Sequence, residues 1–155
     1  MSSIKEKIEI PILFKDNYLN LHDVFLNASL QRSMMIKSPI VPNDINLITD
    51  HFRFERTWLM FLYVLYEAWE APMNKSFRLH LYNTLKLTDL QITLSDLRKK
   101  KKVLKLKNLR DYMAHRDKRE YWDIGRTDIL NNLKTFDLLH QTFSEFFLSK
   151  KSFVE

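Results

Sequence analysis

Apolar residues recur at intervals of three and four positions along most of the chain, and this spacing places side chains on one face of an α-helix. Leu21, Phe25 and Ala28 follow it, which predicts a first helix over residues 16–36. A last helix is predicted over residues 128–148, where one face carries Ile129, Leu133, Phe136, Phe143 and Phe147. Both segments are therefore expected to bury one face and expose the other.

Two further helical patterns lie between these ends. Residues 43–69 predict a long second helix, and its apolar character almost all round between Trp58 and Tyr66 favours a central position. The aromatic residues Trp58, Phe61, Tyr63, Tyr66 and Trp69 are interpreted as core rather than as a base-stacking platform, because no basic residues lie between them. Residues 76–87 predict a third, shorter helix.

The segment that follows is less regular. Whether one or two helices lie between Thr88 and Arg98 stays open at this point. A basic helix should come next and end near Ala114, and a polar connection through Gly125 should lead to the last helix.

Glycine and proline usage favours an all-α fold. Gly125 is the only glycine, whereas tight β-hairpins usually need glycine for positive φ angles. The four prolines fall between the periodic segments, where a residue that interrupts helices is tolerated. With 155 residues, 45% of them hydrophobic, the chain is long enough for one core. We expect a single-domain helical bundle of about five helices over residues 1–155.

Positive charge is concentrated in one segment. Residues 98–119 hold eleven Lys or Arg against two Asp, a net charge of +9, which leaves −3 for the rest of the chain's +6. A basic stripe of this kind favours a polyanionic partner, because cations that neutralise phosphates release condensed counterions. RNA is the partner we expect, and membrane phospholipid would satisfy the same charge.

Composition excludes several other functions. Without cysteine there can be no disulfide, thiolate metal site or Cys nucleophile, which fits a cytoplasmic protein. The five histidines are widely separated and form no metal-binding pattern, and a single glycine excludes a phosphate-cradling glycine loop. No secretory signal is recognisable, and the longest apolar run has nine residues where a membrane span needs about twenty. We expect neither a cofactor nor a metal nor a membrane partner.

The strongest candidate for catalysis is the pair Arg110 and His115, with four residues between them at the end of the basic segment. A planar guanidinium can hold a phosphate through two parallel hydrogen bonds, and an imidazole exchanges protons near neutral pH. Positions five apart differ by about 140° around a helix, so the two side chains need a cleft to meet. His115 could lie on a fraying last turn, or two copies of the helix could form a composite pocket.

Neighbouring residues could assist this pair. Asp111 lies four residues before His115, close enough on a helix to orient the imidazole ring, or else it is a solvated aspartate that balances local charge. Lys107, Arg116 and Lys118 are candidates for contacts with flanking phosphates, the alternative being ordinary surface charges. Glu55, Glu67 and Glu70 could supply a carboxylate to a pocket, but glutamates are common on helix surfaces and these three are interpreted as surface residues of the second helix.

The stretch Leu109-Arg110-Asp111-Tyr112-Met113-Ala114-His115-Arg116-Asp117-Lys118 resembles the motif of the HEPN superfamily (higher eukaryote and prokaryote nucleotide-binding), in particular its bacterial abortive-infection branch. The resemblance implies a helical bundle, a homodimer with a composite cleft, and a metal-independent endoribonuclease of abortive-infection or toxin type. It matches Arg110 and His115 to the catalytic pair and Asp111 to the polar residue after the Arg.

The same resemblance bears on the partners. It implies RNA, such as tRNA or mRNA, as substrate and an antitoxin or regulatory protein as a further partner. In one toxin branch of the superfamily a Tyr two residues after the His is modified by the partner, whereas this chain has Asp117 there. Neutralisation by that route is therefore not expected.

A second class of function stays open. The chain could be a non-catalytic helical module that binds nucleic acid or a protein partner through residues 98–119, and more simply the stripe could only solubilise one face of a dimer. The paired presence of Arg110 and His115 favours the enzyme, because electrostatic binding alone does not need a histidine at position 115.

Overall fold

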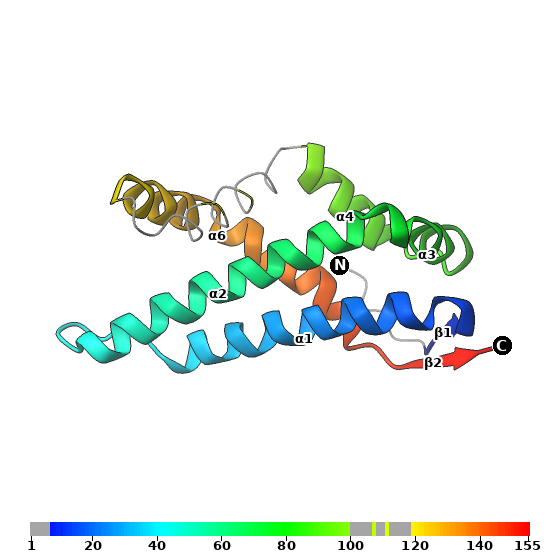
Figure 1. The fold of residues 1–155 in the computed structure, drawn as a ribbon, viewed down its shortest axis with the longest axis horizontal. Helices are drawn as coiled ribbons and strands as arrows, with labels where there is room; N and C mark the ends of the chain where they lie inside the picture. The colour runs from blue at the N-terminus through cyan, green and yellow to red at the C-terminus, as the bar shows by residue number, and fades with distance from the viewer. Residues whose placement is uncertain (1–6, 100–106, 108–110, 112–118) are drawn as a thin grey trace.

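Two long helices joined by a short turn form the frame of the molecule. The computed structural model describes residues 7–99 and 119–155, together with Lys107 and Asp111. Helices α1 (Lys15–Lys37) and α2 (Ile45–Glu70) run side by side in opposite directions (Figure 1). Helix α6 (Arg119–Phe147) crosses this pair, and α4 (Thr88–Lys99) packs against α6. The prediction of a mostly helical bundle is confirmed.

The ends of α2 follow from local sequence. Asn43 adopts a positive φ of 69°, which asparagine tolerates, and the Asp44 carboxylate then accepts a hydrogen bond from the Leu47 backbone N–H at 3.1 Å. At the other end, Ala71 is extended because Pro72 follows it. The Arg78 guanidinium donates to the Ala71 carbonyl at 2.9 Å and also to the carbonyl of Trp69, one of the last four carbonyls of the helix.

The segment after α2 is more irregular than the sequence pattern indicates. A 3₁₀ turn, η2 (Pro72–Asn74), leads into a short α3 (Lys75–Leu79), which continues as a π-helical turn, η3 (His80–Thr84). The turn closes with a hydrogen bond of 3.2 Å from the Leu85 N–H to the His80 carbonyl. The predicted third helix is therefore present but changes its winding halfway. Between Thr88 and Lys99 the structure has one helix, α4, which resolves the question left open above.

A two-stranded parallel sheet joins the two ends of the described chain, although the apolar periodicity of the sequence predicts helices only. Strand β1 (Ile8–Pro11) pairs with β2 (Lys151–Val154), and a 3₁₀ turn, η1 (Ile12–Phe14), connects β1 to α1. Ile8 and Ile10 are buried whereas Glu9 is exposed, the alternation expected of a half-buried strand. The sheet lies beside the first turns of α1 (Figure 1).

The start of α6 corrects a prediction. The helix begins at Arg119 and runs through Gly125, where we expected a polar connection. A single glycine inside a helix lowers helix stability by about 1 kcal/mol relative to alanine but does not terminate it when both flanks continue the helix. The predicted helix over residues 128–148 is thus the second part of a 29-residue helix.

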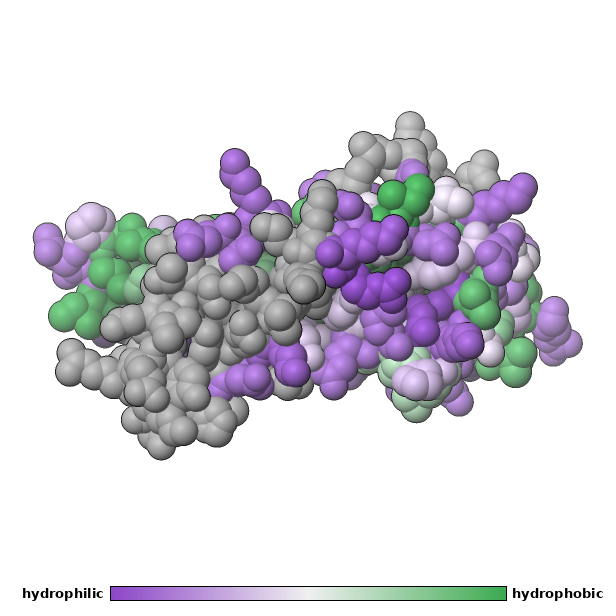
Figure 2. All heavy atoms as spheres, turned by 90° about the horizontal axis from the view of Figure 1, so that it is seen from above, coloured by the Kyte–Doolittle hydropathy of each residue, from purple (hydrophilic) through white to green (hydrophobic). Residues whose placement is uncertain are grey.

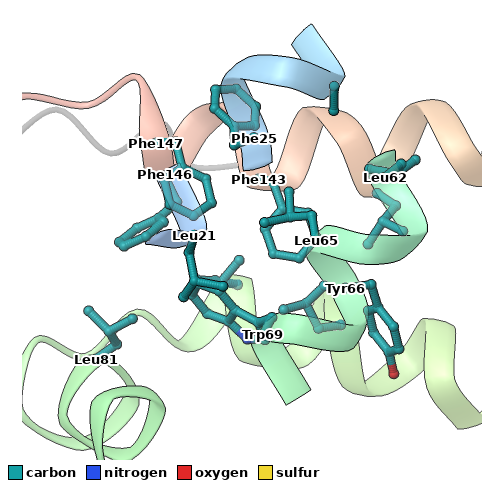
Figure 3. Packing of buried hydrophobic residues seen from close by; sticks show 14 of the residues in the cluster. Leu21, Phe25, Leu62, Leu65, Tyr66, Trp69, Leu81, Phe143, Phe146 and Phe147 are labelled. Carbon is teal, nitrogen blue, oxygen red and sulfur yellow. The ribbon is translucent and has the colours of Figure 1, made fainter. Parts of the chain in front are cut away.

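One cluster of buried apolar side chains draws on β1, all the described α-helices and the π-helical turn (Figure 3). Its centre is aromatic: the Trp69 ring lies 5.4 Å from Phe143 and 5.6 Å from Phe146, centroid to centroid, both edge-on. The Trp69 indole also donates to the Tyr82 hydroxyl at 2.9 Å. The interpretation of the second helix's aromatic residues as core is confirmed for Trp58, Tyr66 and Trp69, which are buried.

Apolar side chains also remain on the surface. Hydrophobic residues gather at the end of the molecule where α1 passes into α2, and smaller hydrophobic groups lie among hydrophilic residues towards the other end (Figure 2). The exposed residues at this end include Ile36, Ile40, Val41 and Ile45.

Candidate functional site

The residues of the predicted catalytic motif are described only in part. Lys107 is helical and exposed, and Asp111 is helical and half-buried, with an interaction partner of its own. Arg110, His115, Arg116 and Lys118 lie outside the described residues. The geometry of the Arg110 and His115 pair therefore stays a prediction.

A second candidate site lies between the C-terminal half of α1 and the last third of α6. The two helices diverge here and leave a groove of about 710 Å³. The described residues that line it are polar apart from Ile36: Ser29, Arg32, Ser33, Ile36 and Lys37 from α1 with Asp137, His140, Gln141 and Ser144 from α6.

The helical register explains why the groove forms at this place. On α1, the apolar positions Leu21, Phe25 and Ala28 are followed at the next turn by Arg32. On α6, His140 falls midway between the buried Phe136 and Phe143. Both helices therefore place a polar residue where the stripe would otherwise continue apolar. This signal is present in the sequence, yet a polar residue in register does not reveal which helix it will face.

Arg32 is held in place from two sides. Its Nη2 donates to Oδ1 of Asp137 at 3.3 Å, and its guanidinium carbon lies 5.6 Å from the centroid of the Trp58 ring. The Arg32 side chain is 34% exposed, but its Nε is buried and has no hydrogen-bond partner among the described residues. A buried N–H without an acceptor is unfavourable by about 1–3 kcal/mol. The guanidinium is thus positioned and retains unused donor capacity.

His140 is buried at the floor of this site, and its protonation state follows from its neighbours. The Trp58 indole N–H donates to His140 Nδ1 at 3.0 Å, and because an indole can only donate, Nδ1 must be unprotonated. Burial and, to a smaller extent, the nearby Arg32 charge together lower the pKa of His140 to about 4. At neutral pH the ring is therefore neutral, with its proton on Nε2.

These properties favour binding over catalysis in the groove. A histidine with a pKa near 4 is a poor general base and is not protonated at neutral pH. No group of three metal-ligating side chains occurs within the part of the chain that the structure describes. What the groove offers is a concentration of hydrogen-bond donors around one fixed guanidinium.

Glu55 differs from the surface residue predicted from the sequence. It is 3% exposed, and its Oε2 lies 3.6 Å from Nε2 of His51, whose Nδ1 is 2.8 Å from the Ser38 carbonyl oxygen. Glu70 keeps its expected place nearer the surface, 3.8 Å from Arg98. A buried carboxylate is recognised only from the packing of its helix, because spacing along α2 does not distinguish it from an exposed one.

No family model, curated protein or solved structure matches this chain. None of the described helices is both long and apolar enough to cross a bilayer. The resemblance of residues 109–118 to the HEPN motif therefore remains a prediction from the sequence.

Proposed function

We propose that the protein is a metal-independent endoribonuclease of the HEPN type, with Arg110 and His115 as its catalytic pair. The observation that carries the proposal is the order Arg110-Asp111-Tyr112-Met113-Ala114-His115 at the end of a segment in which eight of thirteen residues, 98–110, are Lys or Arg. The mostly helical architecture is compatible with it.

The proposed chemistry uses the RNA's own 2′-hydroxyl as nucleophile. A base removes the 2′-hydroxyl proton, the 2′-oxygen attacks the adjacent phosphorus, and an acid protonates the departing 5′-oxygen. The products are a 2′,3′-cyclic phosphate and a 5′-hydroxyl. His115 transfers protons, and Arg110 stabilises the charge that develops on the phosphorane. Asp111 orients the imidazole, while Lys107, Arg116 and Lys118 hold flanking phosphates.

A homodimer completes this mechanism. One step needs a base and another needs an acid, and two copies of the motif across a two-fold axis supply two histidines. Light scattering at micromolar concentration is expected to give a dimer. A stable monomer would contradict the composite cleft without contradicting the fold.

The decisive experiment incubates the purified protein with total RNA in the presence of EDTA. We expect cleavage to persist in chelator and to leave 2′,3′-cyclic phosphate ends. His115→Ala should lower the rate by roughly 10²-fold or more, because it removes proton transfer while leaving RNA affinity nearly intact.

Arg110→Lys tests the role of the guanidinium separately from its charge. Lysine conserves the charge but cannot donate two parallel hydrogen bonds, so cleavage should also be lost. Arg53→Lys is a matched control, because Arg53 is an exposed residue of α2 that lies 3.6 Å from Asp50. Unchanged cleavage by both His115→Ala and Arg110→Lys, or loss of wild-type activity in EDTA, would reject the mechanism.

The density of positive charge favours a second candidate, a non-catalytic module that binds RNA or another polyanion through residues 98–119. In either case, replacing Lys99 to Lys102 should weaken RNA binding for every sequence. Each lost phosphate contact should flatten the dependence of log K on log salt by about one unit. An unchanged slope would mean that these lysines only solvate the surface.

A further inference from the structure

We propose that the groove between α1 and α6 binds a small phosphate monoester that also carries hydroxyl groups. None of the lining residues described belongs to the Arg110 and His115 motif, and the inference does not depend on the ribonuclease activity. The polar lining, the fixed guanidinium of Arg32 and the size of the groove carry the inference.

Size and lining define the class of ligand. A volume of about 710 Å³ falls in the range of about 300–1,000 Å³ that is typical of small-molecule sites. Among the described lining residues, Ile36 is the one apolar side chain and His140 the one aromatic ring, so the groove favours a polar ligand over a hydrophobic one. Three serine hydroxyls and the Gln141 amide instead suit the hydroxyl groups of a sugar-like compound.

The charges favour an anion. Arg32 and Lys37 face the groove with two positive charges against one negative charge on Asp137, and His140 adds none because it is neutral at neutral pH. A single carboxylate beside two cations is a poor site for a metal ion. An anionic group is therefore the better occupant.

Arg32 has the geometry to hold a phosphate. Asp137 engages Nη2, whereas Nε is buried without an acceptor among the described residues. Because the Arg32 side chain is 34% exposed, the Nη N–H groups that Asp137 does not engage can donate to the oxygens of a phosphate in the groove. Lys37, on the last turn of α1, supplies a second charge.

The test uses the full chain and ribose 5-phosphate, with inorganic phosphate and ribose as partial ligands, in calorimetric titrations at low salt. We expect ribose 5-phosphate to bind more tightly than phosphate, and ribose not to bind measurably. Equal binding of ribose and ribose 5-phosphate, or binding of none of the three compounds, would overturn the proposal.

Variants locate the binding. Arg32→Gln should weaken ribose 5-phosphate about tenfold or more, since a hydrogen bond to a charged group is lost. Lys37→Gln, at an exposed helix end, should weaken it several-fold without a risk to folding. Arg53→Gln removes an exposed charge from α2 and should leave the affinity unchanged. Equal affinities in the parent, Arg32→Gln and Lys37→Gln would place the ligand elsewhere and reject the groove.

A competition experiment distinguishes the source of the phosphate. A short RNA oligonucleotide with a 5′-phosphate should fail to displace ribose 5-phosphate, while the sugar phosphate itself competes. Displacement by the phosphorylated oligonucleotide, but not by the same oligonucleotide without its 5′-phosphate, would assign the groove to a nucleic-acid end and overturn the small-ligand assignment.

Discussion

Helices α1 and α6 meet at one end through aromatic rings and at the other through a polar groove. At the end next to the strands, Phe25 stacks on Phe147 at 5.1 Å between ring centroids, and Tyr18 meets Phe146 edge-on at 6.1 Å. About two turns after Phe25, Arg32 on α1 lies near His140 on α6, and both residues line the groove of about 710 Å³. The same two helices thus form both a dry contact and a candidate binding site.

The difference between the two ends shows that a few residue changes on the same two helices decide whether the helices pack closely or leave a groove. Phe25 and Arg32 occupy related positions on α1, seven residues apart, and His140 and Phe147 are likewise seven apart on α6. Seven residues are nearly two helical turns, so each pair lies on one face. Phe25 and Phe147 fill the space between the helices, whereas Arg32 and His140 both contact the Trp58 ring and line an open groove.

Replacing an aromatic side chain at the end next to the strands should have the largest effect on the free energy of unfolding. Phe147 is 3% exposed, and its ring contacts Tyr18, Phe25 and Trp69. We expect Phe147→Ala to lower the free energy of unfolding by about 3–5 kcal/mol, measured by urea denaturation. Gln141→Ala in the groove is the matched control and should change it by less than about 0.5 kcal/mol. Similar losses in both variants would show that the two ends are packed alike.

The second-largest effect on stability is expected from acid, because His140 at the polar end must become protonated. The pKa of His140 is about 4 in the folded protein against 6.5 for a free histidine, so the unfolded chain binds more protons between these values. The contribution of His140 to stability is therefore complete above pH 6.5 and decreases as the pH falls towards 4, by about 3 kcal/mol in total.

His140→Gln isolates this contribution from that of the carboxylates, which titrate in an overlapping range. Stability measured by denaturant titration from pH 7 to pH 4 should fall less steeply in the variant than in the parent. Parallel pH profiles would mean that His140 is protonated in the folded state with an ordinary pKa, and the neutral ring assigned to the groove would be wrong.

The ion pair between Arg32 and Asp137 should make the smallest contribution to the free energy of unfolding. Both side chains are partly exposed, at 34% and 45%, so solvent screens the pair. We expect Asp137→Asn to change the free energy of unfolding by less than about 1 kcal/mol, and by less still in high salt. Asp50→Asn, which removes the partner of Arg53 on the surface of α2, is a control of the same kind. A loss of several kcal/mol for Asp137→Asn alone would indicate that the pair holds the two helices together.

Most helices were predictable from the sequence because their signals are local. The predicted bounds of the first two helices lie within two residues of α1 and α2, and Asp44 and Pro72 mark where α2 begins and ends. Local signals misled at Gly125, where the helix continues, and they did not predict β1, whose partner β2 lies about 140 residues away. A short strand is stabilised by its partner, so its own four residues carry a weak signal.

Of the two candidate sites, one is visible in the sequence and the other only in the tertiary structure. The basic segment and the pair Arg110 and His115 are visible as residue types at a fixed spacing, and both stay predictions of function. The sequence also determined by itself that the protein is mostly helical and has no cysteine chemistry. Tertiary structure decided that Glu55 is buried, that His140 is neutral beside Trp58, and that Arg32 lines a groove. Burial, pKa values and cavity shape depend on which helix faces pack against each other. Such packing brings together residues such as Arg32 and Asp137, which lie 105 positions apart in the sequence.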